Sequence, residues 1–115
     1  MIQQLRIYEI FEGNKSAFHA RFQQHALPIM ERYGFEIVAM WESTLPDGPR
    51  FVYILNWPDV QTKETAWRRF LADLEWIEIK RVTRLEHGDL VGGVEDYLLV
   101  PTPYSPTTLV RAGAP

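Results

Sequence analysis

Apolar and polar residues alternate along four segments of this sequence, as they do in strands that bury one face. The first segment covers residues 4–12, with the sequence QLRIYEIFE. Two more, residues 36–45 and 50–57, flank the turn sequence PDGP and predict a hairpin. The fourth, residues 94–106, is rich in proline toward its end, so we expect it at an edge of the sheet.

The same alternation assigns side chains to faces of the predicted strands. In the first strand Arg6, Tyr8 and Ile10 share one face. One face of the next strand is expected to carry Ile37, Ala39, Trp41 and Ser43. One face of the third strand is expected to carry Phe51, Tyr53, Leu55 and Trp57.

Residues 17–34 repeat their apolar side chains at the spacing of a helix. One stripe along this helix consists of Phe18, Phe22, His25 and Ile29. Pro28 lies inside the helix and removes one backbone donor, which predicts a kink near His25. Gly34 is expected to end the helix.

A second helix is predicted to begin at Asp59, whose side chain can cap it. Its apolar positions recur with a period of 3.6 residues and are Ala66, Trp67, Phe70, Leu71 and Leu74. Asp73 is expected to cap a continuation after a bend, and Trp76 is expected in the core.

The order β-α-β-β-α-β is typical of an α+β, ferredoxin-like domain with an antiparallel four-stranded sheet and both helices on one side. The other face of such a sheet is left uncovered, and here it would carry aromatic residues. We therefore expect a homodimer in which a second copy covers that face. The predicted domain spans residues 1–106, followed by a tail at residues 107–115.

The composition fits one domain and excludes several classes of function. The chain has 115 residues, 46% of them hydrophobic and 13% aromatic, with a net charge of −3. That charge argues against a nucleic-acid partner. The absence of cysteine excludes disulfides and thiolate chemistry. Neither a signal peptide nor a membrane span is recognisable, so a cytoplasmic location without membrane association is the expectation.

Five short motifs occur in order along the chain: LRIYEIFEG, HALPIMERYG, LNWPD, DLEW and LLVPTPYSP. In this order and spacing the sequence resembles the NIPSNAP family over about residues 3–106. The resemblance implies the fold of the dimeric α/β-barrel superfamily, in which two ferredoxin-like protomers pack sheet on sheet. It also implies a cavity near the sheet, but it says little about chemistry.

His25 is the candidate catalytic residue, as a general base near the mouth of a cavity. A lone histidine on an apolar face more often has a structural role, so both interpretations stay open. No pair of histidines has ligand spacing, and no phosphate loop, dinucleotide fingerprint or nucleophile elbow occurs. We accordingly predict no metal site and no cofactor.

The predicted ligand-binding residues are Arg6, Tyr8, His25, Trp41, Tyr53 and Trp57. Core or dimer packing is the alternative explanation for the three aromatic residues from the hairpin. If Arg6 is buried it needs an anionic partner, and an ion pair with Glu42 is the expected alternative to a bound carboxylate.

Three functions remain open at this point. The first is a homodimeric protein that binds a small apolar or aromatic molecule. The second is a cofactor-independent enzyme of the monooxygenase or isomerase type that uses His25. The third is a scaffold that acts through its dimer surface. The sequence does not name a ligand or a substrate.

Overall fold

The computed structural model of the protein describes residues 1–106, and the predicted tail at residues 107–115 lies outside the described residues. The elements, in chain order, are β1 (Ile2–Ile10), η1 (Glu12–Asn14), α1 (Lys15–Arg21), η2 (Phe22–Ala26), α2 (Leu27–Arg32), β2 (Glu36–Leu45), β3 (Gly48–Trp57), α3 (Val60–Leu71), α4 (Leu74–His87) and β4 (Val91–Leu99). The predicted order of strands and helices is confirmed.

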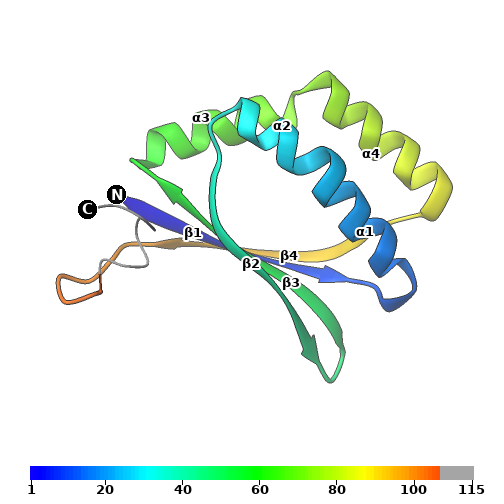
Figure 1. Ribbon diagram of the computed structural model, residues 1–115, viewed down its shortest axis with the longest axis horizontal. Coiled ribbons are helices and arrows are strands. Elements are labelled where there is room, and N and C mark those ends of the chain that lie inside the picture. Colours follow the sequence, from blue (N-terminus) through cyan, green and yellow to red (C-terminus); the bar gives the residue numbers. More distant parts are fainter. Residues whose placement is uncertain (107–115) are drawn as a thin grey trace.

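The four strands form one antiparallel sheet in the order β2-β3-β1-β4. All the helices lie on one face of this sheet, with α1 and α2 in front of α3 and α4 in the view of Figure 1. Strand β4 is an edge strand and ends at Leu99, two residues before Pro101, as its prolines predicted. The fold is therefore α+β and ferredoxin-like.

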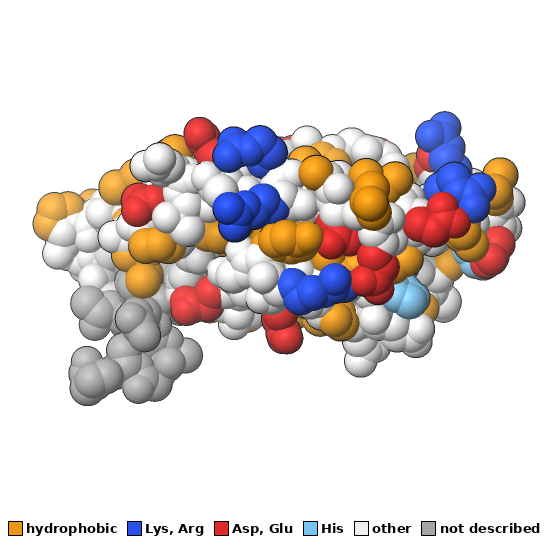
Figure 2. All heavy atoms as spheres, turned by 90° about the horizontal axis from the view of Figure 1, so that it is seen from above, with side chains coloured by type: hydrophobic (Ala, Val, Ile, Leu, Met, Phe, Trp, Pro, Cys, Tyr) orange, Lys and Arg blue, Asp and Glu red, His pale blue; other side chains and the backbone are white. Residues whose placement is uncertain are grey.

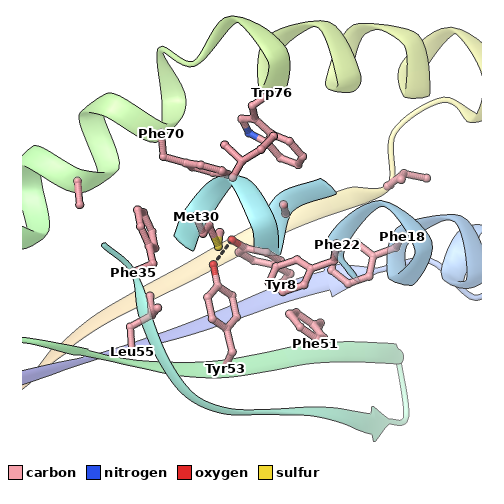
Figure 3. Close-up of a cluster of buried hydrophobic side chains, with 14 of the residues drawn as sticks. Tyr8, Phe18, Phe22, Met30, Phe35, Phe51, Tyr53, Leu55, Phe70 and Trp76 are labelled. Carbon is pink, nitrogen blue, oxygen red and sulfur yellow. Dashed lines mark hydrogen bonds between the residues drawn. The ribbon is translucent and has the colours of Figure 1, made fainter. Parts of the chain in front are cut away.

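The core lies between the sheet and the helices. In β1, Tyr8 and Ile10 point toward the helices, and Tyr8 pairs in register with Phe51 of β3. The strand neighbours Tyr53 and Leu55 are fully buried on the same face. Figure 3 shows these side chains packed against aromatic residues of the first helix. An aromatic core of this size accounts for much of the aromatic content of the chain.

The first long helix contains a π-helical turn, η2, between α1 and α2. Pro28 lies just beyond this turn and cannot donate a backbone hydrogen bond. The helix is therefore irregular near His25, where a kink was predicted, and the irregularity is this π-helical turn. The extra residue in the turn shifts the buried stripe, which consists of Phe18, Phe22, Ala26, Ile29 and Met30. The predicted position of His25 on the buried stripe was therefore wrong, and the side chain is exposed.

Both predicted caps of the second helical segment are confirmed. The Asp59 side chain accepts a hydrogen bond from the backbone N–H of Thr62 at 2.7 Å, at the start of α3. The Asp73 side chain accepts one from the backbone N–H of Trp76 at 2.8 Å, at the start of α4. These bonds satisfy backbone donors that a helix leaves unpaired at its N-terminus. The bend between α3 and α4 lets both helices follow the twisted sheet.

Strand β2 contains a β-bulge. Ile37 pairs with Leu55 and Ala39 pairs with Ile54, so Val38 has no partner in the ladder between them. Beyond the bulge every side chain changes face, because the period of a strand is two residues. The face predicted for this strand was therefore wrong after Ile37.

The bulge decides the position of Trp41. This residue pairs with Val52 and lies on the face of the sheet away from the helices, whereas Met40 and Glu42 point toward them. Trp41 is 49% exposed, and Tyr97 of β4 is exposed to a similar extent. No helix within residues 1–106 covers this face (Figure 1).

Candidate functional site

A pocket of about 250 Å³ lies between the sheet and the helices, on the side of β1 and β4. Arg6 and Tyr8 form its floor on β1, and Val94 borders it on β4. Most of the wall comes from both helical segments, and its larger apolar side chains include Phe18, Phe22, Met30, Trp67, Phe70 and Trp76. The pocket is therefore mainly apolar and rich in aromatic rings, as is usual for sites that bind small molecules.

The aromatic side chains of the wall contact one another at defined angles. The Tyr8 ring meets Phe18 edge to face at 6.2 Å, and Phe70 stacks on Trp76 at 5.2 Å. Contacts of this kind contribute roughly 0.5–1.5 kcal/mol each beyond the area that they bury. The wall is thus held in place before any ligand enters.

Arg6 is the charged group on the floor of the pocket. Its Nη1 donates to Oδ2 of Asp96 at 2.9 Å, and its Nη2 donates to the Tyr8 hydroxyl at 3.1 Å. The guanidinium also lies 4.3 Å from the centre of the Trp67 ring, a cation–π contact. Its Nε is buried and has no hydrogen-bond partner among the described residues. A buried donor without a partner is uncommon in folded proteins.

The ion pair predicted between Arg6 and Glu42 was wrong. Asp96 lies directly opposite Arg6 on β4, whereas Glu42 lies on β2, and β3 separates β2 from β1. Glu42 instead accepts hydrogen bonds from Lys15 at 3.2 Å and contacts His19 Nε2 at 2.8 Å.

Tyr8 and Tyr53 share a short hydrogen bond of 2.5 Å between their hydroxyl groups. Figure 3 shows the two hydroxyls pointing toward each other from neighbouring strands. Burial raises the pKa of Tyr53 well above its ordinary value, so this phenol stays neutral in the folded protein. Tyr8 is consequently fixed from both sides, by Tyr53 and by Arg6.

Gln4 joins this group to two tryptophans. Its Oε1 accepts hydrogen bonds from the indole N–H groups of Trp57 at 3.0 Å and Trp67 at 2.8 Å. Its Nε2 donates to both carboxylate oxygens of Asp96, at 3.0 and 3.1 Å. One buried amide therefore positions the acid that pairs with Arg6 and the ring that Arg6 covers.

Two further basic residues, Arg21 and Lys80, line the pocket from α1 and α4. Both lie over the face of Trp76, with their charged atoms 5.3 and 5.7 Å from the ring centre. Burial lowers the pKa of Arg21, although the neighbouring Tyr8 acts in the opposite direction. Figure 2, which looks onto the helices, shows that this side of the molecule mixes hydrophobic side chains with charges of both signs.

The structure brings together only part of the predicted site. Arg6 and Tyr8 line the pocket, and Tyr53 supports Tyr8 from behind. Trp57 is buried beside Gln4 and does not line the pocket. Trp41 lies on the opposite face of the sheet, and the exposed His25 is not among the lining residues.

The sequence prediction missed Gln4, Arg21, Lys80 and Asp96. For Gln4 a signal was present, because it lies two residues before Arg6 and so shares the face of Arg6 and Tyr8. For Asp96 the signal was weaker, because it follows another acid, Glu95, on an edge strand. Arg21 and Lys80 belong to helices whose outer faces carry many charges, and nothing local separates them from those charges.

Within residues 1–106, no three residues of the types His, Cys, Asp and Glu come close enough to hold a metal ion. The helices in the same part of the chain are all too short or too polar to span a membrane.

The chain is similar to members of one protein family in both sequence and fold. The sequence model of the NIPSNAP family matches residues 3–106. A NIPSNAP family protein with unknown function from Agrobacterium tumefaciens has a similar structure, with a TM-score of 0.76 and 20% identity over 92% of this chain and 92% of that one. An uncharacterized NIPSNAP-like domain protein from Burkholderia xenovorans gives a TM-score of 0.76 and 19% identity, over 91% of this chain and 88% of that one.

A more distant likeness extends to another group of proteins. The structure of an antibiotic biosynthesis monooxygenase gives a TM-score of 0.55 and 13% identity, over 90% of this chain and all of that one (100%). At this identity the likeness concerns the fold alone. No curated protein matches the sequence.

Proposed function

The chain belongs to the NIPSNAP family, and on that premise we propose that it is a homodimeric protein that binds a small apolar or aromatic molecule in the pocket between sheet and helices. The observation that carries the proposal is the pocket itself. It combines an aromatic wall with two polar groups, Arg6 and Tyr8, that converge on its floor. A few placed polar groups in an apolar pocket are typical of small-molecule sites.

The rigidity of the floor supports binding. Arg6 is held by Asp96, Tyr8 and the ring of Trp67, so its side chain is positioned by contacts within the protein. A group that is already ordered loses little conformational entropy when a ligand arrives.

The homodimer is part of the proposal because of the uncovered face of the sheet. Trp41 and Tyr97 are exposed there, and the apolar residues between them are partly buried: Leu5, Ile7, Val52 and Ile54. A continuous apolar patch on a sheet is a common interface. A second copy would cover it without closing the pocket, which opens on the other face.

The enzyme alternative based on His25 receives no support from the geometry, because His25 is exposed outside the pocket. A general base has to reach the proton that it removes, directly or through one water molecule.

The test of ligand binding uses N-phenyl-1-naphthylamine, a neutral aromatic probe whose fluorescence rises in apolar surroundings. Val94 borders the pocket from β4 and is half exposed, so Val94→Trp narrows the pocket without overfilling the core. We expect the wild-type protein to bind the probe and this variant to bind it about tenfold more weakly or worse, a difference of ~1.4 kcal/mol.

Two variants serve as controls. Val82→Trp makes the same change on the exposed side of α4, and His25→Ala removes the histidine outside the pocket. Both should bind the probe within about twofold of wild type, a difference too small to indicate a lost contact. Absence of probe binding to the wild-type protein, or equal binding by Val94→Trp, would contradict the proposal.

A further inference from the structure

We propose that the ligand of this pocket is an aromatic or alicyclic carboxylic acid, bound with its carboxylate between Arg21 and Lys80. This inference rests on the proposed function and names the class of ligand. It follows from the charges of the lining residues, from the partners that each charge has, and from the shape and chemistry of the wall.

All the charged residues that line the pocket are basic: Arg6, Arg21 and Lys80. Arg6 has an anionic partner in Asp96, at 2.9 Å. Arg21 and Lys80 have no ion pair with any acid of residues 1–106, and the charged group of each lies over the Trp76 ring. The pocket therefore has two positive charges that the fold leaves uncompensated.

The environment of Arg21 makes this lack of a partner significant. The side chain is partly buried, and burial lowers its pKa because the charged form loses hydration. An arginine nevertheless stays protonated, so the protein carries a partly desolvated cation. A carboxylate can accept two parallel hydrogen bonds from a guanidinium, and Lys80 can add a third. An anionic head group would thus find donors that are already in place.

The rest of the wall fits an apolar body. Phe18, Phe22 and Phe70 present rings to the pocket, and Trp76 lies beneath the two cations. The volume of about 250 Å³ is below the range of roughly 300–1,000 Å³ that is usual for drug-sized ligands. One or two fused rings with a single carboxylate match this size, whereas an anion with three or more charges would exceed what the two free cations can neutralise.

The experiment compares 2-naphthoate with 2-naphthamide by isothermal titration calorimetry. The two molecules share a ring system and differ in charge. The wild-type protein should bind the acid roughly tenfold or more tightly than the amide, as expected for charge-assisted hydrogen bonds. The preference should shrink at about 0.5 M salt, where the Debye length is only a few ångströms.

Variants assign the preference to residues. Lys80→Gln and Arg21→Gln should each reduce it, and the double variant should bind acid and amide within about twofold of each other. Arg68→Gln removes the same charge from an exposed position of α3 outside the pocket and should keep the wild-type preference. Circular dichroism of each variant checks that the fold persists, and Lys80→Gln provides the test if Arg21→Gln unfolds.

Each outcome separates this inference from the proposed function. If the wild-type protein binds acid and amide equally, or binds N-phenyl-1-naphthylamine but not 2-naphthoate, the carboxylate inference is overturned and small-molecule binding stands. If the double variant keeps the preference, the assignment to Arg21 and Lys80 is overturned. If neither the naphthalene compounds nor the neutral probe bind, both proposals fail.

Discussion

Replacing Gln4 by methionine tests the interpretation that one buried amide organises the floor of the pocket. Methionine has nearly the same length and volume but offers neither a strong acceptor nor a donor. Gln4 is 1% exposed, so no water can take the place of its amide. The variant leaves the indole N–H groups of Trp57 and Trp67 without their acceptor.

The expected loss of stability can be worked out group by group. The Trp57 indole is buried, so its unpaired N–H should cost roughly 1–3 kcal/mol. Trp67 is only partly buried, so its indole N–H can donate to water, and its contribution to the loss of stability should be smaller. Asp96 is exposed enough for water to replace the lost donor, so its contribution to the loss of stability should be near zero. The sum is roughly 1–4 kcal/mol, a substantial part of the 5–15 kcal/mol that is usual for a domain.

Urea unfolding followed by circular dichroism, at one fixed protein concentration, measures this loss of stability. The urea concentration at half unfolding should fall, and the slope of the unfolding free energy against urea should stay the same. Gln24→Met makes the same change on an exposed part of η2 and should stay within about 0.5 kcal/mol of wild type. In a Trp57→Phe background the cost of Gln4→Met should fall by roughly 1 kcal/mol, because one of the donors is gone. A cost below about 1 kcal/mol in the wild-type background, or no change in the Trp57→Phe background, refutes the reasoning.

Two further predictions follow from other parts of the structure. Because the pKa of Tyr53 is raised above 10.0, the unfolded state loses this proton first as pH rises, so wild-type stability should fall above pH 10. As pH rises above 10, the urea midpoint should fall less for Tyr53→Phe than for the control Tyr104→Phe, which removes an exposed phenol. Parallel plots of midpoint against pH for the two variants would contradict this prediction. Light scattering at micromolar concentration should give the wild-type protein twice the chain mass of 13.4 kDa, and it should give Trp41→Glu the mass of a single chain. The control Val60→Glu places the same charge on an exposed position of α3 and should remain dimeric. A monomeric wild-type protein would contradict the homodimer.

The parts of the fold that the sequence predicted correctly depend on short-range chemistry. The Asp59 and Asp73 caps each involve a backbone N–H only three residues away. The hairpin depends on a turn sequence between two alternating runs, and the edge position of β4 depends on its prolines. Signals of this kind are visible in any window of about ten residues.

Two of the misplaced candidates, His25 and Trp41, were assigned to the wrong face because one extra residue is inserted in their element. The π-helical turn inserts a residue into the first helix, and the bulge at Val38 inserts one into β2. In both cases the hydrophobic pattern continues across the insertion, so the change of face leaves no mark in the sequence. Tertiary packing decides such details, because each irregularity is stabilised by what the shifted side chains bury.

The polar floor of the pocket could not be predicted from the sequence, for a different reason. Gln4 and Asp96 are 92 positions apart in the sequence, and only the pairing of β1 with β4 brings them together. The single chain offers no signal that links an amide near its start to an acid near its end. The charge of Arg6 was recognised, but its partner could be identified only from the strand order.

The four tryptophans lie in three different environments, and this arrangement gives the protein a built-in set of optical reporters. Trp67 and Trp76 border the pocket, Trp57 is sealed in the core, and Trp41 faces outward from the bare side of the sheet. The emission of an indole depends on the polarity around it. Ligand binding should change the fluorescence emission of Trp67 and Trp76. Association of two chains should change the emission of Trp41, and unfolding of the core should change the emission of Trp57. Proteins that retain one tryptophan each, with phenylalanine at the other three positions, would therefore let one spectrometer follow three separate events.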